Sequence, residues 1–367
     1  MVKNGFRVMD SDMHVIEPPD LWQRYIDADF LQRAPKGISR WPGDMQIDLE
    51  GHLMPSVPGE WGKARAQAQA EAYQDGYEHG FDAGSQVRAL DEEGIDIAVL
   101  YPSRGLFTLA LNTMDPGLGS AIARAYNHWL YDFCNTAPDR LYGAAMVSPF
   151  DVQSASGEAR RAVGELGFKG IFLRPNIVNG RNWHDPHYDP LWAEIEGLDV
   201  PLGFHEGATA AMTQVGGRFE TYMMHHTCCH PMEMMLALVD LIGGGVLERF
   251  PRLKVAFLEG NCAWAPWLLW RLDEHFELSG RFESPGLSLE PTEYFRRQCY
   301  LSVEADEEPA LFVERSGLVA NVVFSTDYPH NDSKYPHAIE RFLEIPFEEE
   351  TKANILWDNC ARLYNLS

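Results

Sequence analysis

The sequence of 367 residues has no long apolar run and no excess of positive charge. A helix needs about 20 consecutive apolar residues to cross a bilayer, and no segment approaches that length. Lys and Arg number 30 against 54 Asp and Glu, giving a formal net charge of −24. So acidic a chain repels phosphate backbones and anionic membranes. We therefore expect no nucleic-acid partner and no membrane partner.

Several local patterns are also missing. The six cysteines form no C-x-x-C pair, which is typical of reduced thiols. The N-terminus carries no apolar segment like that of a secretory signal, so we expect a cytoplasmic protein. The glycine patterns of dinucleotide and P-loop sites are absent, and Ser103 and Ser325 lack the glycine-flanked turn of a serine hydrolase.

What the chain does contain is a regular alternation of short apolar runs and helical patterns. Runs that are apolar throughout are typical of parallel strands covered by helices on both faces. Eight such alternations predict an α/β fold, a (β/α)8 TIM barrel, in preference to a doubly wound sheet. The expected strands are residues 6–15, 95–101, 141–147, 168–173, 200–204, 253–258, 299–304 and 321–326.

The domain prediction is a single metal-dependent barrel over residues 1–367. Between the first two strands, residues of about 27–84 lose the pattern and are rich in Trp, Pro, Gly and polar side chains. We expect an irregular insertion there, which serves either as a lid over a site or as an oligomer contact. The sequence does not choose between these two roles.

The first strand ends in a carboxylate and an imidazole, Asp12 and His14. Residues two apart on a strand project to the same face, so these side chains form half of a divalent-metal site. The alternative is a solvated strand end before the turn at Pro18-Pro19.

Polar residues also end most of the other expected strands. In TIM barrels the chemistry lies at the carboxyl ends of the strands. Acidic groups are rarely buried there without a partner or a metal, and converging carboxylates repel each other without a cation. This ring therefore favours the metal site over the solvated alternative. Its members are Asp12, His14, Tyr101, Arg174, His205, Glu259, Glu304 and Asp327.

Three motifs resemble the amidohydrolase-2 group of the amidohydrolase superfamily, which includes aminocarboxymuconate semialdehyde and γ-resorcylate decarboxylases. They are Asp-Met-His-Val-Ile-Glu-Pro from Asp12, Pro-Leu-Gly-Phe-His-Glu-Gly around His205, and Ser-Thr-Asp-Tyr-Pro-His around Asp327. The resemblance covers nearly the whole chain and is weakest over residues 27–84. It implies a TIM barrel in which Asp12, His14, His205 and Asp327 bind a divalent metal such as Zn or Mn.

The chain departs from the family pattern at two positions. Asp12 stands where the common first motif, H-x-H, has its first histidine. Glu259 ends the sixth strand, where many members carry a catalytic histidine, so that residue's proton-transfer role does not transfer. A carboxylate at Glu259 could act as a general base or bridge to a second metal.

Ligands for a second metal are available in the loop ahead of a helix expected to begin near Pro231. This loop contains His225, His226 and His230, and we include His226 in the predicted metal set. The alternative is that these are surface or hydrogen-bonded histidines. With Glu259 they would complete a non-haem di-iron set, because carboxylates mixed with imidazoles suit Fe or Mn as well as Zn.

The remaining candidates are assigned by chemistry. Asp327, Glu259 and His330 are predicted catalytic groups, with His330 orienting substrate or binding a loop carbonyl. Arg174 suits a carboxylate clamp or a structural salt bridge, and Tyr101 is predicted to contact substrate.

The leading hypothesis is a metal-dependent enzyme of the amidohydrolase superfamily acting on a small or mid-sized, carboxylated organic substrate by decarboxylation or hydrolysis. One alternative is a non-haem di-iron oxygenase on the same barrel, and another is a non-catalytic binding protein. We expect one or two divalent ions per chain (Zn, Mn or Fe), a small-molecule substrate and a homodimer. The predicted metal ligands are Asp12, His14, His205, Asp327, Glu259 and His226.

Overall fold

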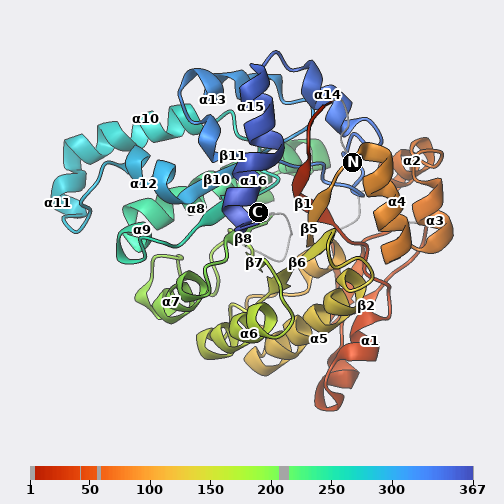
Figure 1. The fold of residues 1–367 in the computed structure, drawn as a ribbon. Coiled ribbons are helices and arrows are strands. Elements are labelled where there is room, and N and C mark those ends of the chain that lie inside the picture. The colour runs from red at the N-terminus through yellow and green to blue at the C-terminus, as the bar shows by residue number, and fades with distance from the viewer. Residues whose placement is uncertain (1–4, 42, 56–58, 206–214, 367) are drawn as a thin grey trace.

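The computed structural model describes residues 5–41, 43–55, 59–205 and 215–366. Eight parallel strands form one sheet in sequence order, which confirms the predicted barrel topology. In Figure 1 the strands lie at the centre and the helices surround them. The strands are β1 (Met9–His14), β5 (Ile97–Tyr101), β6 (Leu141–Met146), β7 (Gly170–Leu173), β8 (Leu202–Phe204), β9 (Val255–Phe257), β10 (Cys299–Val303) and β11 (Val322–Phe324).

Helices follow the strands, and three of the longer ones begin at capping aspartates. The carboxylates of Asp82, Asp115 and Asp151 accept hydrogen bonds from the first turns of α4, α5 and α6. The helices are α1 (Leu21–Tyr25), α2 (Gly59–Ala68), α3 (Gln74–His79), α4 (Ala83–Glu93), α5 (Pro116–Cys134), α6 (Val152–Gly164), α7 (Asp189–Leu198), α8 (Tyr222–Gly243), α9 (Val246–Arg249), α10 (Ala265–His275), α11 (Arg281–Glu283), α12 (Pro291–Gln298), α13 (Leu311–Arg315), α14 (Ala338–Glu344), α15 (Glu349–Ala353) and α16 (Asn359–Tyr364). Within the described ranges, none is both long and apolar enough for a membrane span.

The first and last strands meet through side-chain hydrogen bonds. Ser11 Oγ donates to the Phe324 carbonyl at 2.6 Å, and Ser325 Oγ donates to the Asp12 carbonyl at 3.2 Å. The Tyr364 hydroxyl of α16 also donates to the backbone of β1, at the Ser11 carbonyl, over 2.8 Å. These bonds bring the carboxyl ends of β1 and β11 to the same place at the barrel mouth.

The insertion at residues 27–84 is more ordered than its sequence pattern predicts. It contains a three-stranded antiparallel sheet formed by β2 (Lys36–Gly37), β3 (Ile47–Leu49) and β4 (His52–Met54). The β3–β4 turn uses Glu50 and Gly51, both with positive φ, as a two-residue hairpin loop requires. Apolar side chains of this sheet belong to the same buried core as the barrel.

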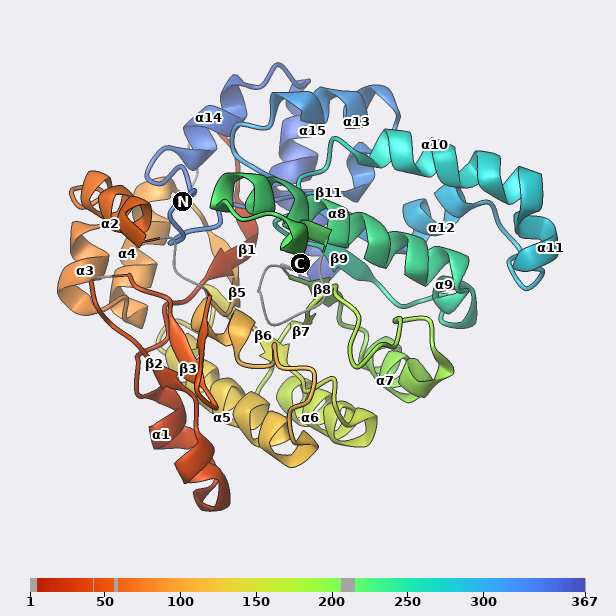
Figure 2. The same ribbon diagram turned by 180° about the vertical axis from the view of Figure 1, so that it is seen from behind.

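Helices α2 and α3 of the insertion lie beside the loop that follows β11, as the second view shows (Figure 2). Arg65 Nε and Gln69 Nε2 both donate to the Asn331 carbonyl, at 2.8 and 2.9 Å. The Tyr73 hydroxyl donates to the His330 carbonyl at 3.2 Å. The insertion therefore supports a loop of the barrel mouth, while its role as a lid or an oligomer contact stays a prediction.

Candidate metal centre

A carboxylate and two imidazoles converge at the carboxyl ends of β1 and β8. Asp12 Oδ1 lies 3.5 Å from His14 Nε2 and 3.5 Å from His205 Nε2, and all three side chains are buried. Neither carboxylate oxygen of Asp12 accepts a hydrogen bond from the described residues. Burying a carboxylate in this way is costly unless a cation compensates it. The arrangement fits a divalent metal, whose ligands in proteins are imidazole nitrogens and carboxylate oxygens.

A hydrogen bond to the backbone fixes the orientation of the His14 ring. Its Nδ1 lies 2.8 Å from the Pro102 carbonyl, which only accepts hydrogen bonds. Nδ1 therefore carries the proton, and the lone pair of Nε2 faces Asp12. A backbone carbonyl that fixes the tautomer in this way is the usual outer partner of a metal-binding histidine.

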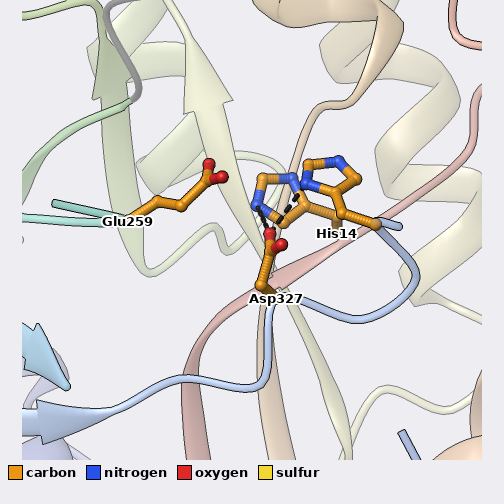
Figure 3. Close-up of side chains that lie close together, drawn as sticks. His14, Glu259 and Asp327 are labelled. Carbon is orange, nitrogen blue, oxygen red and sulfur yellow. Dashed lines mark ion pairs between the residues drawn. The ribbon is translucent and has the colours of Figure 1, made fainter. Parts of the chain in front are cut away.

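Asp327 and His330 approach His14 from the end of β11. Asp327 Oδ1 lies 3.4 Å from His14 Nε2 and 2.7 Å from His330 Nδ1. The rings of His14 and His330 stack with centroids 4.0 Å apart. On the other side, His330 Nε2 lies 2.8 Å from Ser103 Oγ. Figure 3 shows the carboxylates of Asp327 and Glu259 directed towards the His14 side of the site from two different elements.

Burial shifts the pKa values of Asp327 and His330 towards their neutral forms. Desolvation, followed by the charges of Glu259, Asp332 and Asp12, raises the pKa of Asp327 well above its usual range. Desolvation and the neighbouring His14 lower the pKa of His330 well below its usual range. Without a cation, the centre therefore favours a protonated carboxyl and a neutral imidazole.

Glu259 extends the cluster towards α8. Its Oε2 lies 3.1 Å from His205 Nε2, and its Oε1 lies 3.4 Å from His230 Nδ1. His226 and His230 are neighbours on α8 with ring centroids 4.3 Å apart. One ligand atom each from His226, His230 and Glu259 lies within 4.8 Å of the other two. The structure thus brings together all six predicted metal ligands and adds His230.

Arg174 and Tyr101 are the two predicted substrate contacts. Arg174 Nη1 donates to the carbonyls of Leu109 and Ala110 at 2.8 and 3.0 Å. Burial lowers the pKa of Arg174 to about 10, and no carboxylate in the described part of the chain forms an ion pair with it. The salt bridge considered for Arg174 is therefore not observed, and its role as a clamp stays a prediction.

Tyr101 lies inside the barrel. Its side chain is fully buried, its ring stacks on His205 with centroids 5.9 Å apart, and its hydroxyl lies 3.2 Å from that of Tyr364. Tyr101 thus supports His205 from within the barrel, and its role as a substrate contact stays a prediction.

Two residues near the centre, Ser103 and Glu17, are given no role at the site by the sequence patterns. The Glu17 carboxylate accepts hydrogen bonds from the backbone N–H groups of Ser103, Arg104 and Gly105, at 3.2, 2.8 and 3.0 Å. A Cβ at Gly105 would lie 2.9 Å from Glu17 Oε1, so glycine permits this close approach. Glu17 thereby fixes the loop that presents Ser103 to His330.

Replacing Glu17 by alanine is expected to lower the free energy of unfolding by about 3 kcal/mol, because buried N–H groups lose their acceptor. Urea unfolding measures the change. Glu274→Ala is the matched control, since Glu274 is exposed on α10. A Glu17→Ala midpoint equal to that of the control would contradict the assigned role.

Comparison with known proteins agrees with this geometry. A family model described as amidohydrolase matches residues 12–366. The 2-amino-3-carboxymuconate-6-semialdehyde decarboxylase of Dictyostelium discoideum is 25% identical over 341 residues, which cover 88% of this chain and 92% of the relative.

Solved structures share the fold. The 5-carboxyvanillate decarboxylase of Sphingomonas paucimobilis has a TM-score of 0.73 at 22% identity, covering 99% of this chain and 100% of that chain. A dihydroxybenzoic acid decarboxylase from Polaromonas sp. JS666, solved with manganese and the inhibitor 2-nitroresorcinol, has a TM-score of 0.69 at 18% identity, with 98% and 97% covered. These likenesses confirm the predicted barrel.

Proposed function

Because the chain belongs to the amidohydrolase family, we propose that it is a metal-dependent decarboxylase of small carboxylated organic acids. The observation that carries the proposal is the buried donor set of Asp12, His14 and His205, in which both Asp12 oxygens lack hydrogen-bond donors among the described residues. The decarboxylases among its relatives favour loss of CO2 over hydrolysis. They also favour it over the di-iron oxygenase and the non-catalytic binding protein.

The centre would hold a divalent cation through Asp12, His14, His205 and Asp327. Such a cation binds substrate oxygens and stabilises the negative charge that develops as a carboxylate leaves. Manganese is the first choice, because the set mixes hard carboxylate oxygens with imidazole nitrogens and a protein of the same fold was solved with manganese.

Within this site, Asp327 would bind the cation through one carboxylate oxygen, and we propose that its other oxygen takes a proton from water and delivers it to the carbon that loses CO2. His330 Nδ1 lies 2.7 Å from Asp327 Oδ1, while His330 Nε2 lies 2.8 Å from Ser103 Oγ. A neutral His330 that carries its proton on Nδ1 accepts a hydrogen bond from the Ser103 hydroxyl at Nε2 and places its Nδ1–H beside the Asp327 carboxylate. Ser103 is thus a positioning residue that orients His330, and His330 orients Asp327.

The test is turnover of manganese-loaded protein with 2,6-dihydroxybenzoate, 5-carboxyvanillate and related hydroxybenzoates in D2O. Decarboxylation predicts CO2 in equal amount to product, with one deuterium on the carbon that carried the carboxylate. Incorporation of oxygen from labelled water without CO2 would replace decarboxylation by hydrolysis. Consumption of O2 with a hydroxylated product would instead support the oxygenase.

Replacing Ser103 by alanine is expected to lower kcat by about 10- to 100-fold, the range found for outer partners of metal sites. KM and manganese content should stay unchanged, because Ser103 contacts His330 and none of the four proposed ligands directly. Steady-state kinetics and elemental analysis of the same sample check both points. Ser120→Ala is the control, because Ser120 is a half-buried serine of α5 whose hydroxyl donates to the Pro116 carbonyl. An unchanged kcat in Ser103→Ala would contradict the positioning role of Ser103.

A further inference from the structure

The two oxygens of Glu259 face different histidines. Oε2 lies 3.1 Å from His205 Nε2, which belongs to the first centre, and Oε1 lies 3.4 Å from His230 Nδ1 on α8. We propose that His226, His230 and Glu259 hold a second divalent cation, and that Glu259 bridges it to the first. The proposal rests on the proposed function to the extent that the first centre is occupied.

Helix α8 presents its two imidazoles as a preformed pair. His226 and His230 are four residues apart, so they lie on the same helix face one turn from each other. Their ring centroids are 4.3 Å apart, and Tyr222, one turn earlier, stacks on His226 at 4.6 Å. A helix holds such a pair without any ordering of a loop when the metal binds.

The backbone at Glu259 is held in place by a hydrogen bond to the neighbouring strand β10. Ser302 Oγ accepts a hydrogen bond from the Glu259 backbone N–H at 2.9 Å, and Glu259 has a left-handed φ of 49°. The next residue is Gly260, where a Cβ would lie 2.7 Å from Met234 Cγ of α8. The missing side chain at Gly260 therefore allows the end of β9 to approach α8 closely enough for Glu259 to meet His230.

The charge of the region also calls for more than one cation. Glu259 adds a carboxylate to Asp12 and Asp327, and its side chain is 7% exposed. Each buried carboxylate disfavours ionisation of the others, and a second divalent cation offsets that repulsion.

A site with two cations favours substrates that offer two oxygen ligands. Each cation can then bind one oxygen of the same substrate molecule. A carboxylate with an adjacent hydroxyl, as in an ortho-hydroxybenzoate, offers such a pair of oxygens. If the second site is occupied, we therefore expect the enzyme to prefer substrates with a hydroxyl next to the carboxylate.

The experiment counts manganese in the full-length protein after loading with excess Mn(II) and removal of the free ion. We expect two ions per chain by elemental analysis, and an exchange-coupled electron paramagnetic resonance spectrum in place of the spectrum of isolated Mn(II). The double variant His226→Ala/His230→Ala should retain one ion and lose the coupling. His225→Ala is the matched control, because His225 lies in the same turn but packs against Gly216, and it should keep both ions.

Three outcomes separate the claims. One ion per chain in the unaltered protein, lost in Asp12→Asn but kept in the double histidine variant, overturns the second site and leaves the proposed function intact. Two ions retained in the double variant place the second ion elsewhere and also overturn the proposal. A protein that binds no manganese at all contradicts the proposed function itself.

Discussion

Replacing His205 by alanine is expected to remove bound manganese and catalytic activity together. His205 ends β8 and lies 3.5 Å from Asp12 and 3.1 Å from Glu259, so its imidazole faces both carboxylates. Loss of the cation removes charge stabilisation worth several kcal/mol, which corresponds to a fall in kcat/KM of at least about 10³-fold. Elemental analysis and decarboxylation assays on one preparation measure the two losses.

The control for this substitution is His275→Ala. His275 is an exposed residue of α10 whose Nδ1 lies 2.9 Å from the Arg271 carbonyl. It undergoes the same chemical change away from the centre and should leave metal and activity unaltered. His205→Ala protein that is folded by circular dichroism, fully loaded with manganese and fully active would remove His205 from the ligand set.

Chelation of the metal is expected to abolish activity and lower the melting temperature reversibly. A cation that binds only the native state at about 1,000 times its Kd contributes about 4 kcal/mol. For a chain of this length that corresponds to roughly 5 °C in Tm. Without the cation, burial and then the charges of Glu259, Asp332 and Asp12 raise the pKa of Asp327 and so disfavour its ionised form.

Scanning calorimetry with and without added Mn(II) measures this shift. The Asp12→Asn variant provides the comparison, because it keeps the shape of the side chain and removes one anionic ligand. Its Tm should rise less with Mn(II) than that of the unaltered protein, because only the proposed second site keeps all its ligands. An equal rise in Tm in both proteins would show that Asp12 does not bind the stabilising ion.

Short-range sequence patterns predict the barrel and the polar side chains that gather at its mouth. Unbroken apolar runs place buried parallel strands, and the residue that ends each run lies at the barrel mouth. The patterns thereby locate Asp12, His14, His205, Glu259 and Asp327, and these five side chains lie close together. Their roles as ligands stay predictions that the experiments above test.

The sequence does not show that His226 and His230 lie on one helix, because it predicts that this helix begins too late. Pro231 favours a helix start, but α8 begins at Tyr222 and contains Pro231 in its interior. The overlooked signal was Thr221, whose hydroxyl accepts a hydrogen bond from the Met224 N–H and caps the helix. With that boundary, the spacing of His226 and His230 predicts a shared helix face.

Other features could not be read from sequence because they depend on contacts between distant segments. The Pro102 carbonyl fixes the tautomer of His14 across 88 residues, and Ser103 reaches His330 across 227. No periodicity or motif carries such information. Similarly, only the packed barrel shows that Tyr101 points inward.

The contact between β1 and β11 has a consequence for how the protein folds. Ser325 and Asp12, which form one of its hydrogen bonds, are 313 residues apart in the chain. Contacts of such long sequence separation form slowly, and Asp327 leaves the ribosome among the last residues of the barrel. The first centre therefore cannot form until synthesis has passed Asp327 and β11 has met β1. The amount of metal bound at this centre then reports how many molecules have closed the barrel.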